Sequence, residues 1–315
     1  MSRLPVSARL FLSGTLLALA VPLSFSQRTR IVPQLHTGQT FFYHIDFSSS
    51  RDVKTESRVA SPQLPAAASV SASGLLQVEI TEVTAAGFRL KTYYSERPPT
   101  SSSPQSVAAP TADKSVEVFV AANGSASQIK GFDQLSPAQQ FAWNDWLGRF
   151  TSSLAFPKGG VTAGRKWEAA EPETAPSPIA GLTWTKKYHY VRDEPCGLYD
   201  QSANANQKKP TSSSQLCAIV LVRATLHQKS SPKSATPEDY KLRDLKTRGI
   251  ATGQNETILY ISRSTGLLIR STEDAQQFMD AIVALTDGTN QVHYRLNAKS
   301  HSQIFLVPDS PQESR

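Results

Sequence analysis

The sequence predicts a mainly β protein: a curved antiparallel sheet or half-barrel with one amphipathic helix packed against it. Three observations predict this class. Many segments alternate apolar and polar side chains with a period of two, turn dipeptides separate them, and one segment has the helical period of 3.6. The 315 residues are 39% hydrophobic and 19% charged, which is the composition of a globular protein. A mean hydropathy of −0.32 excludes a protein made of several apolar membrane helices.

Residues 1–26 are predicted to be a signal peptide. Arg3 and Arg9 precede a short apolar stretch, and small side chains follow it up to Ser26. The stretch is too short for a membrane span, which needs about 20 apolar residues. We expect cleavage after Ser26, with Ala20 as the alternative, and export to the periplasm or the extracellular space. The mature protein is then expected to have no integral membrane span.

Residues 27–315 are predicted to form a single β-rich domain. In the first strand, 39–48, the side chains of Phe41, Tyr43 and Ile45 would lie on one side and polar residues on the other. The same alternation, with Gly-containing turns between segments, predicts the rest of the sheet. The further expected strands are 76–81, 88–93, 116–120, 182–192, 218–227, 258–262, 267–270 and 292–296.

The segment 274–285 fits two secondary structures. Phe278, Met279 and Ile282 recur at a spacing that would suit a helix. Asp287 and Gly288, which follow the segment, are typical of a β-hairpin. We favour a strand because the hairpin turn connects it to the next expected strand.

Five segments rich in Ser, Pro and Ala interrupt the pattern and are expected to be long, mobile loops. They have few apolar side chains to offset the entropy lost on ordering. The segment 97–113 is also a candidate domain boundary, although a single sheet is simpler because strands resume directly after it. The five segments are 60–73, 97–113, 168–179, 201–214 and 228–238.

The predicted helix covers 137–150. Ser136 can cap its first turn, a proline follows at the first helical position, and Gln139 can complete a capping box. An aromatic stripe then runs along one face of this helix. This stripe most often marks a core face that packs on a sheet.

Trp143, Trp146 and Phe150 make up this stripe, together with a leucine. Contact with a bound ligand is the alternative role for these three residues. Asp145 and Arg149 are expected to pair on the polar side of the helix.

Cys196 and Cys217 are expected to form one disulfide. They are the only cysteines of the chain, and export would place them in an oxidising compartment. Their spacing is too wide for a redox-active C-x-x-C pair, and no histidine lies near either of them in sequence, as a metal site would require.

No motif for catalysis, a metal or a cofactor stands out. The six histidines are isolated, and the sequence has no nucleophile elbow, phosphate-binding loop, dinucleotide fingerprint or EF-hand loop. The net charge falls from +7 to +5 when the two arginines of the signal peptide are removed. The remaining basic residues are scattered, so we do not expect a nucleic-acid partner.

Three patches of sequence resemble uncharacterised exported bacterial proteins rich in β structure. They are the F-P-x-G-G-V-x-x-G-x-x-W stretch at 156–167, the Ser-Thr-Gly turn at 264–266 and the Asp-Gly hairpin at 287–288. Some of those proteins are similar to the half-closed barrel of the periplasmic lipoprotein carriers. The resemblance implies a curved antiparallel sheet around the helix 137–150, and it carries over no catalytic residues. The long Ser/Pro-rich loops depart from the compact carriers.

The sequence supports three hypotheses of function. The first is a non-enzymatic binding or carrier protein, whose concave apolar sheet face accepts a lipid-like ligand or an apolar segment of an envelope partner. The second is a structural or interaction protein of the envelope that uses the Ser/Pro-rich loops as contact surface. The third is a hydrolase assembled from distant residues, which would place His44, His189 or His293 beside a serine or a carboxylate in a cleft.

Overall fold

A computed structural model describes residues 28–57, 67–96, 115–173, 177–197 and 215–307, and its strands form one antiparallel sheet. The predicted signal peptide and the predicted loops 97–113 and 201–214 lie outside the described residues. The strands are β1 (Thr40–Ser57), β2 (Ala67–Thr84), β3 (Gly87–Glu96), β4 (Ser115–Ala121), β5 (Ala126–Lys130), β6 (Lys166–Pro172), β7 (Leu182–Pro195), β8 (Leu216–Gln228), β9 (Leu245–Ser262), β10 (Leu268–Leu285) and β11 (Val292–Val307). The helices are α1 (Pro137–Ser153), α2 (Glu238–Lys241) and a 3-10 turn, η1 (Phe132–Gln134).

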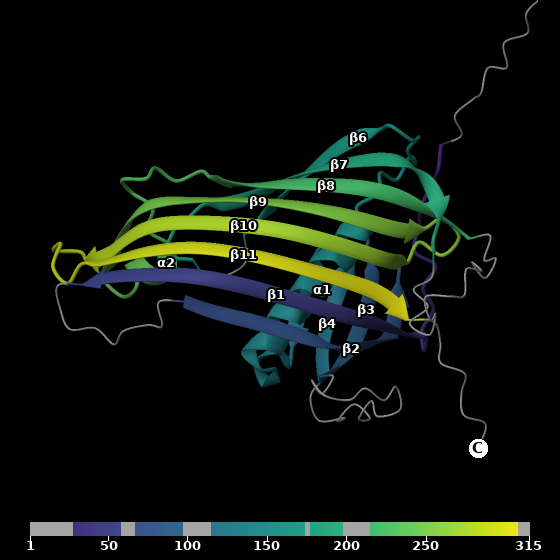
Figure 1. The fold of residues 1–315 in the computed structure, drawn as a ribbon, viewed down its shortest axis with the longest axis horizontal. Coiled ribbons are helices and arrows are strands. Elements are labelled where there is room, and N and C mark those ends of the chain that lie inside the picture. The colour runs from purple at the N-terminus through teal and green to yellow at the C-terminus, as the bar shows by residue number, and fades with distance from the viewer. Residues whose placement is uncertain (1–27, 58–66, 97–114, 174–176, 198–214, 308–315) are drawn as a thin grey trace, which may run out of the picture.

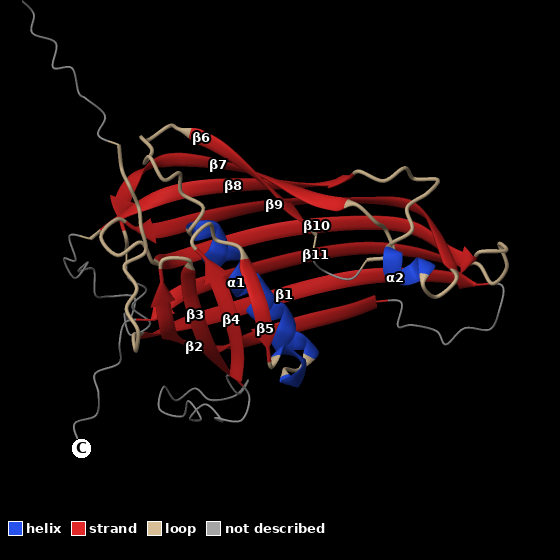
Figure 2. Cartoon of the chain, turned by 180° about the vertical axis from the view of Figure 1, so that it is seen from behind, coloured by secondary structure: helices blue, strands red, loops and turns tan. Residues whose placement is uncertain are grey.

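The sheet is an open meander in which two strands far apart in the sequence pair at the centre. The strand order is β5-β4-β3-β2-β1-β11-β10-β9-β8-β7-β6, so the first strand of the described chain pairs with the last. In that pairing Ile45 lies opposite Ile304. The outermost strands, β5 and β6, do not pair with each other, and the sheet curls around α1 as a half-barrel (Figures 1 and 2). The predicted fold class is confirmed.

Both edge strands of the sheet have features that disfavour pairing with a further strand. β5 is short and wholly exposed, and its Gln128 has a φ of 54°, which interrupts the extended backbone. β6 carries charged side chains and ends on Pro172, which has no N–H to donate. Such features prevent edge-to-edge association of sheets.

Helix α1 begins as the sequence predicts. Ser136 accepts a hydrogen bond from the backbone N–H of Gln139, and the Gln139 side chain accepts one from the N–H of Ser136. The helix continues to Ser153, beyond the predicted end at residue 150. Its aromatic residues pack on the sheet, with the ring of Trp146 5.9 Å from that of Tyr43. In the described chain no helix is long and apolar enough to cross a bilayer.

Several strands are longer than the alternation of apolar residues indicated. β1 continues through residues 49–57, which are polar except for Val53. Two expected loops, 60–73 and 168–179, were partly wrong, because residues 67–73 belong to β2 and 168–172 to β6. These residues have few large apolar side chains, but each strand gains backbone hydrogen bonds from a neighbouring strand. Pairing of distant strands therefore overrides the local composition.

The ambiguous segment 274–285 is a strand. It forms most of β10, which pairs along its length with β9 on one side and β11 on the other. The expected disulfide is present as well, between Cys196 after β7 and Cys217 in β8. β3 and β4, on either side of the candidate boundary at 97–113, pair with each other in the same sheet.

Two of the sequence patches that carry the resemblance contact the N-terminal segment of the described chain. Thr29 and Val161 exchange two backbone hydrogen bonds, of 2.7 and 2.9 Å. The N–H of Gln34 donates to the carbonyl of Thr265 at 2.8 Å. Gly266 has a φ of 70°, and a Cβ there would come within 2.7 Å of the backbone of Pro33, so the turn needs glycine.

Candidate functional site

The sheet has an inner face, which contacts α1, and an outer face, which points away from it. Odd-numbered residues of β1 lie on the inner face, since Tyr43 contacts Trp146 and Phe47 stacks on Phe141 at 6.1 Å. Even-numbered residues of β1, such as Ser48, therefore lie on the outer face. The two faces differ in chemistry.

The three aromatic residues predicted as ligand contacts are buried between α1 and the inner face. Trp143 and Trp146 have 0% exposed surface, and Phe150 has 1%. The indole Nε1 of Trp143 donates a hydrogen bond to Oγ1 of Thr92 at 2.8 Å. A ligand could touch these rings only if α1 moved away from the sheet.

A buried cluster of charged groups lies beside the aromatic core. The guanidinium of Arg149, only 2% exposed, donates from Nη2 to both carboxylate oxygens of Asp145 at 2.5 and 2.6 Å. Its Nη1 donates to Oγ of Ser271 in β10 at 2.9 Å, and Nη2 also contacts Oγ of Ser302 in β11. These contacts tie α1 to the centre of the sheet.

A second carboxylate completes the cluster. Oε2 of Glu273 lies 3.5 Å from Nε of Arg149 and accepts a hydrogen bond from Oγ1 of Thr257 at 2.8 Å. The pKa of Asp145 is raised to about 6, because burial and the charge of Glu273 raise it by more than Arg149 lowers it. The cluster therefore holds two acidic groups against one guanidinium, with Asp145 and Arg149 buried and Glu273 half-buried.

The predicted pair of Asp145 and Arg149 is present, and the polar side of the helix that carries it is buried. The sheet curls far enough around α1 to cover this side of the helix as well as the aromatic side, with Ser271 and Ser302 as polar partners. A helical pattern distinguishes apolar from polar sides, but it does not tell which sides the rest of the chain will bury.

Part of the inner face is not covered by α1. It begins beyond Arg51, whose guanidinium lies 4.3 Å from the centre of the Phe141 ring, and it extends towards α2 (Figure 2). We call it the open inner surface, and we define it by side chains of β1, β10 and β11 that are all half-buried. These are Val53, Met279, Tyr294, Leu296 and Ala298.

The residues of the open inner surface are neighbours in the sheet. Leu296 lies opposite Val53 on one side and Met279 on the other. A small second core, separate from the one around α1, includes Ala251 and Ala281. Met279 and Trp184 of β7 both pack against it. Trp184 lies so close to Gly253 that a Cβ there would come within 2.9 Å of the indole.

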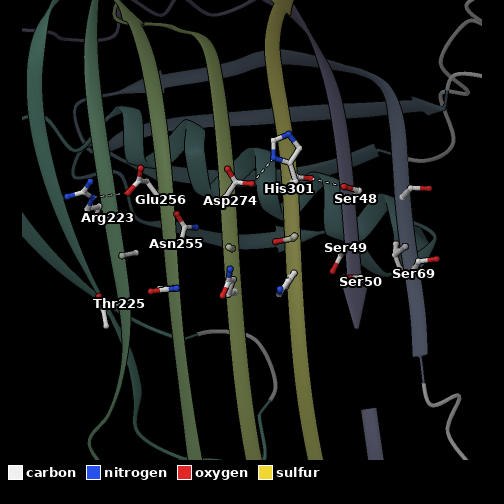
Figure 3. Close-up of a pocket in the computed structure, with 18 residues that line it drawn as sticks. Ser48, Ser49, Ser50, Ser69, Arg223, Thr225, Asn255, Glu256, Asp274 and His301 are labelled. Atoms are coloured by element: carbon white, nitrogen blue, oxygen red, sulfur yellow. Dashed lines mark hydrogen bonds and ion pairs between the residues drawn. The ribbon is translucent and has the colours of Figure 1, made fainter. Parts of the chain in front are cut away.

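A groove with a volume of about 810 Å³ crosses the outer face. Its side chains form rows across strands β8, β9, β10, β11 and β1, and Figure 3 shows one such row in front of the sheet, with a helix behind. The row runs Arg223, Glu256, Asp274, His301, Ser48, each opposite the next in the strand register. A smaller groove of about 410 Å³ adjoins it over β6 to β8 and shares Arg223.

Two histidines lie beside carboxylates on the outer face: His293, which the hydrolase hypothesis named but which is not part of the groove, and His301, which the hypothesis did not name. Nε2 of His293 is 2.7 Å from Oδ1 of Asp280, and Nδ1 of His301 is 2.8 Å from Oδ1 of Asp274. A hydrolase of this type also needs a hydroxyl bonded to the ring. In the groove, Oγ of Ser48 instead donates to the backbone carbonyl of His301, at 3.3 Å. Within the described residues, no group of acidic, histidine or cysteine side chains is arranged to hold a metal.

No family model and no curated protein matches the sequence. Solved structures with limited likeness include the outer membrane protein OprG from Pseudomonas aeruginosa, at 8% identity over 87% of this chain and 99% of that one, with a TM-score of 0.17. An outer membrane channel from Pseudomonas putida F1 aligns at 9% identity over 87% and 97%, with a TM-score of 0.15. A variant porin of Rh. blastica aligns at 10% identity over 84% and 99%, with a TM-score of 0.17.

TM-scores this low do not establish a common fold. The case for a function therefore rests on the geometry of this chain. Sequence reasoning found the aromatic stripe of α1, but it missed the buried cluster, the open inner surface and the outer groove. For the open inner surface and the outer groove, the sequence offered only the alternation of side chains along each strand. Met279 and Phe278, for example, are adjacent in sequence and lie on opposite faces.

Proposed function

We propose that this protein is a non-enzymatic binding or carrier protein that holds an apolar chain, such as that of a lipid-like ligand, on the open inner surface. The observation that carries the proposal is the set of half-buried apolar side chains around Leu296, at adjoining positions of a concave sheet. Burying such surface in a bound ligand is favourable by about 25 cal/mol for each Å² removed from water.

The neighbourhood of the open inner surface suits an extended apolar chain. The positions between it and α1 carry small side chains, among them Ala275 and Ser300, whereas Gly253 is covered by the indole of Trp184. The ring of Trp184 borders the open inner surface on one side, and Phe141 of α1 borders it on another. A ligand that displaced α1 would also reach Trp143, Trp146 and Phe150, so these residues are a second contact zone under this proposal.

The export that the sequence predicts supports the proposal. A signal peptide at 1–26 and a disulfide at Cys196 and Cys217 suit a protein that works in the periplasm or outside the cell, where apolar ligands need a carrier through water. An apolar segment of an envelope protein is the other occupant of this surface that the sequence suggested.

The first test is native mass spectrometry of the protein purified from the periplasm, followed by extraction with organic solvent. We expect a bound species of lipid mass that the extraction releases. Binding is then measured by the fluorescence of a long-chain fatty acid that carries an environment-sensitive dye. Co-purification of a polypeptide in place of a lipid would favour the envelope partner.

A matched pair of variants tests the location. Met279→Lys places a charge on the open inner surface. Phe278→Lys places the same charge one residue earlier, on a side chain that is 41% exposed on the outer face. We expect the first variant to weaken fatty-acid binding about tenfold or more, which is about 1.4 kcal/mol, and the second to change it little. Equal binding by the two variants, with both folded by circular dichroism, would contradict the proposed site.

A further inference from the structure

The outer groove is built from two parallel rows of polar side chains. The second row lies two residues along each strand from the first and runs Thr225, Gln254, Gln276, Lys299, Ser50. Ser69 and Ser71 of β2 extend the rows to a sixth strand. Six strands at about 4.8 Å give rows about 24 Å long, which run across the sheet.

The charges of the groove are largely compensated within it. Nε of Arg223 donates to Oε2 of Glu256 at 2.8 Å, and His301 pairs with Asp274. Lys299 adds one further positive charge. A polyanion would be expected to need a row of uncompensated cations. The pattern of the groove therefore favours an uncharged ligand.

The lining also differs from that of a protein–protein interface. The centre of such an interface is usually apolar and rich in aromatic side chains. Most of the residues that line the groove have hydroxyl, amide or charged side chains, and its apolar members are valine and alanine. Hydroxyl and amide groups both donate and accept hydrogen bonds, so they match a ligand whose own groups do the same.

An exposed aromatic side chain lies next to the second row. Phe278 is 41% exposed and follows Gln276 by two residues on the same strand, hence on the same face. Asn297 and Thr252 lie opposite it on the neighbouring strands. An exposed ring beside a polar groove offers a flat surface on which the C–H face of a sugar ring can pack.

We propose that the outer groove binds an uncharged oligosaccharide, laid across the strands, with its hydroxyls on the two polar rows and one sugar ring on Phe278. The groove lies on the face opposite the open inner surface, so the two sites can be occupied together. A protein with both sites would hold an apolar ligand on one face while it rests on a glycan with the other.

The test is isothermal titration calorimetry on the full mature chain. The titrants are neutral oligosaccharides of glucose and of N-acetylglucosamine, and a heparin fragment as the polyanion. We expect at least one neutral chain to bind, with an affinity that is nearly independent of salt. Heparin binding that falls steeply with salt, without binding of a neutral chain, would overturn the proposal. So would the absence of any binding.

Two adjacent glutamines provide a matched control. Gln276 belongs to the groove, whereas Gln277 points to the inner face of the same strand. Gln276→Ala and Phe278→Ala should each weaken oligosaccharide binding about three- to tenfold, and Gln277→Ala less than about twofold. An equal loss in Gln276→Ala and Gln277→Ala would overturn the assignment to the outer groove. None of these substitutions removes a large core side chain, so all three variants should fold.

Discussion

Arg149 of α1 and Glu273 of β10 face each other inside the molecule, with Nε of the guanidinium 3.5 Å from Oε2 of the carboxylate. Asp145 shares the same guanidinium from one helical turn earlier. The interface between the helix and the sheet therefore depends on compensated charges as well as on aromatic packing. Removing one charge from such a cluster leaves the others buried without compensation.

Arg149→Met should destabilise the protein strongly. The substitution keeps much of the apolar volume but leaves two carboxylates without their cation, and we expect the free energy of unfolding to fall by about 3–5 kcal/mol. Urea unfolding followed by circular dichroism measures the change. Arg223→Met, which breaks the exposed pair with Glu256, is the control and should cost no more than about 1 kcal/mol. Similar losses in the two variants would show that the buried cluster contributes no more than a surface pair.

Asp145 should make stability depend on pH in an unusual direction. Its pKa is raised to about 6 in the folded protein, above the ordinary value of 3.8, so the folded state binds the proton more tightly than the unfolded chain. The stabilisation from this proton is complete below the ordinary value and is lost as the pH rises through about 6. Asp145→Asn, which cannot ionise, should flatten the dependence of the unfolding free energy on pH between about 4 and 6.

Urea unfolding at a series of pH values measures this effect. The difference in slope between the wild type and Asp145→Asn reports the Asp145 carboxyl group together with its interaction with Glu273, because the other titrating groups are shared. Identical slopes would show that Asp145 titrates alike in the folded and unfolded states.

The two buried tryptophans of α1 should differ in their tolerance of phenylalanine. Trp143 donates to Thr92, whereas Nε1 of Trp146 is buried without a hydrogen-bond partner in the described part of the chain. Both substitutions remove a similar volume, so the difference reports the hydrogen bond. Trp143→Phe should cost about 1 kcal/mol more than Trp146→Phe in urea unfolding. A larger loss from Trp146→Phe would contradict the assignment.

The disulfide should contribute to stability through the loop it closes. Cys196 and Cys217 are 21 residues apart in sequence, and a loop of this length corresponds to about 3 kcal/mol of lost entropy in the unfolded chain. The double variant with serine at both positions should lose about this free energy of unfolding. Both cysteines are buried, so a reductant should open the bond in the native protein only slowly. Unchanged stability of the double variant would show that the loop is already restricted in the unfolded chain.

Much of the fold could be predicted from short stretches of sequence. The capping box of Ser136 and Gln139 marked the start of α1, and Asp287 with Gly288 decided that the preceding segment is a strand. Strand ends were harder to predict. Residues 49–57 of β1 are polar except for Val53 and lack an apolar alternation, yet they pair with β11 along their whole length.

The candidate sites were harder to predict from the sequence than the fold was. The rows of the outer groove join single residues from six strands, such as Gln276 and Ser50, which have nothing in common in sequence except their polarity. The open inner surface exists because α1 ends its contact with the sheet near Arg51, and this depends on where the helix lies.

Local signals in the chain thus decided the class of structure, the helix start and the pairing of two cysteines, because each depends on residue types, on their count or on neighbours a few positions apart. Three features were decided only by packing: the contact of the first strand with the last, the burial of Arg149, and which side of each strand faces solvent. These depend on residues far apart in sequence, and a period of two or of 3.6 does not say which segments will meet.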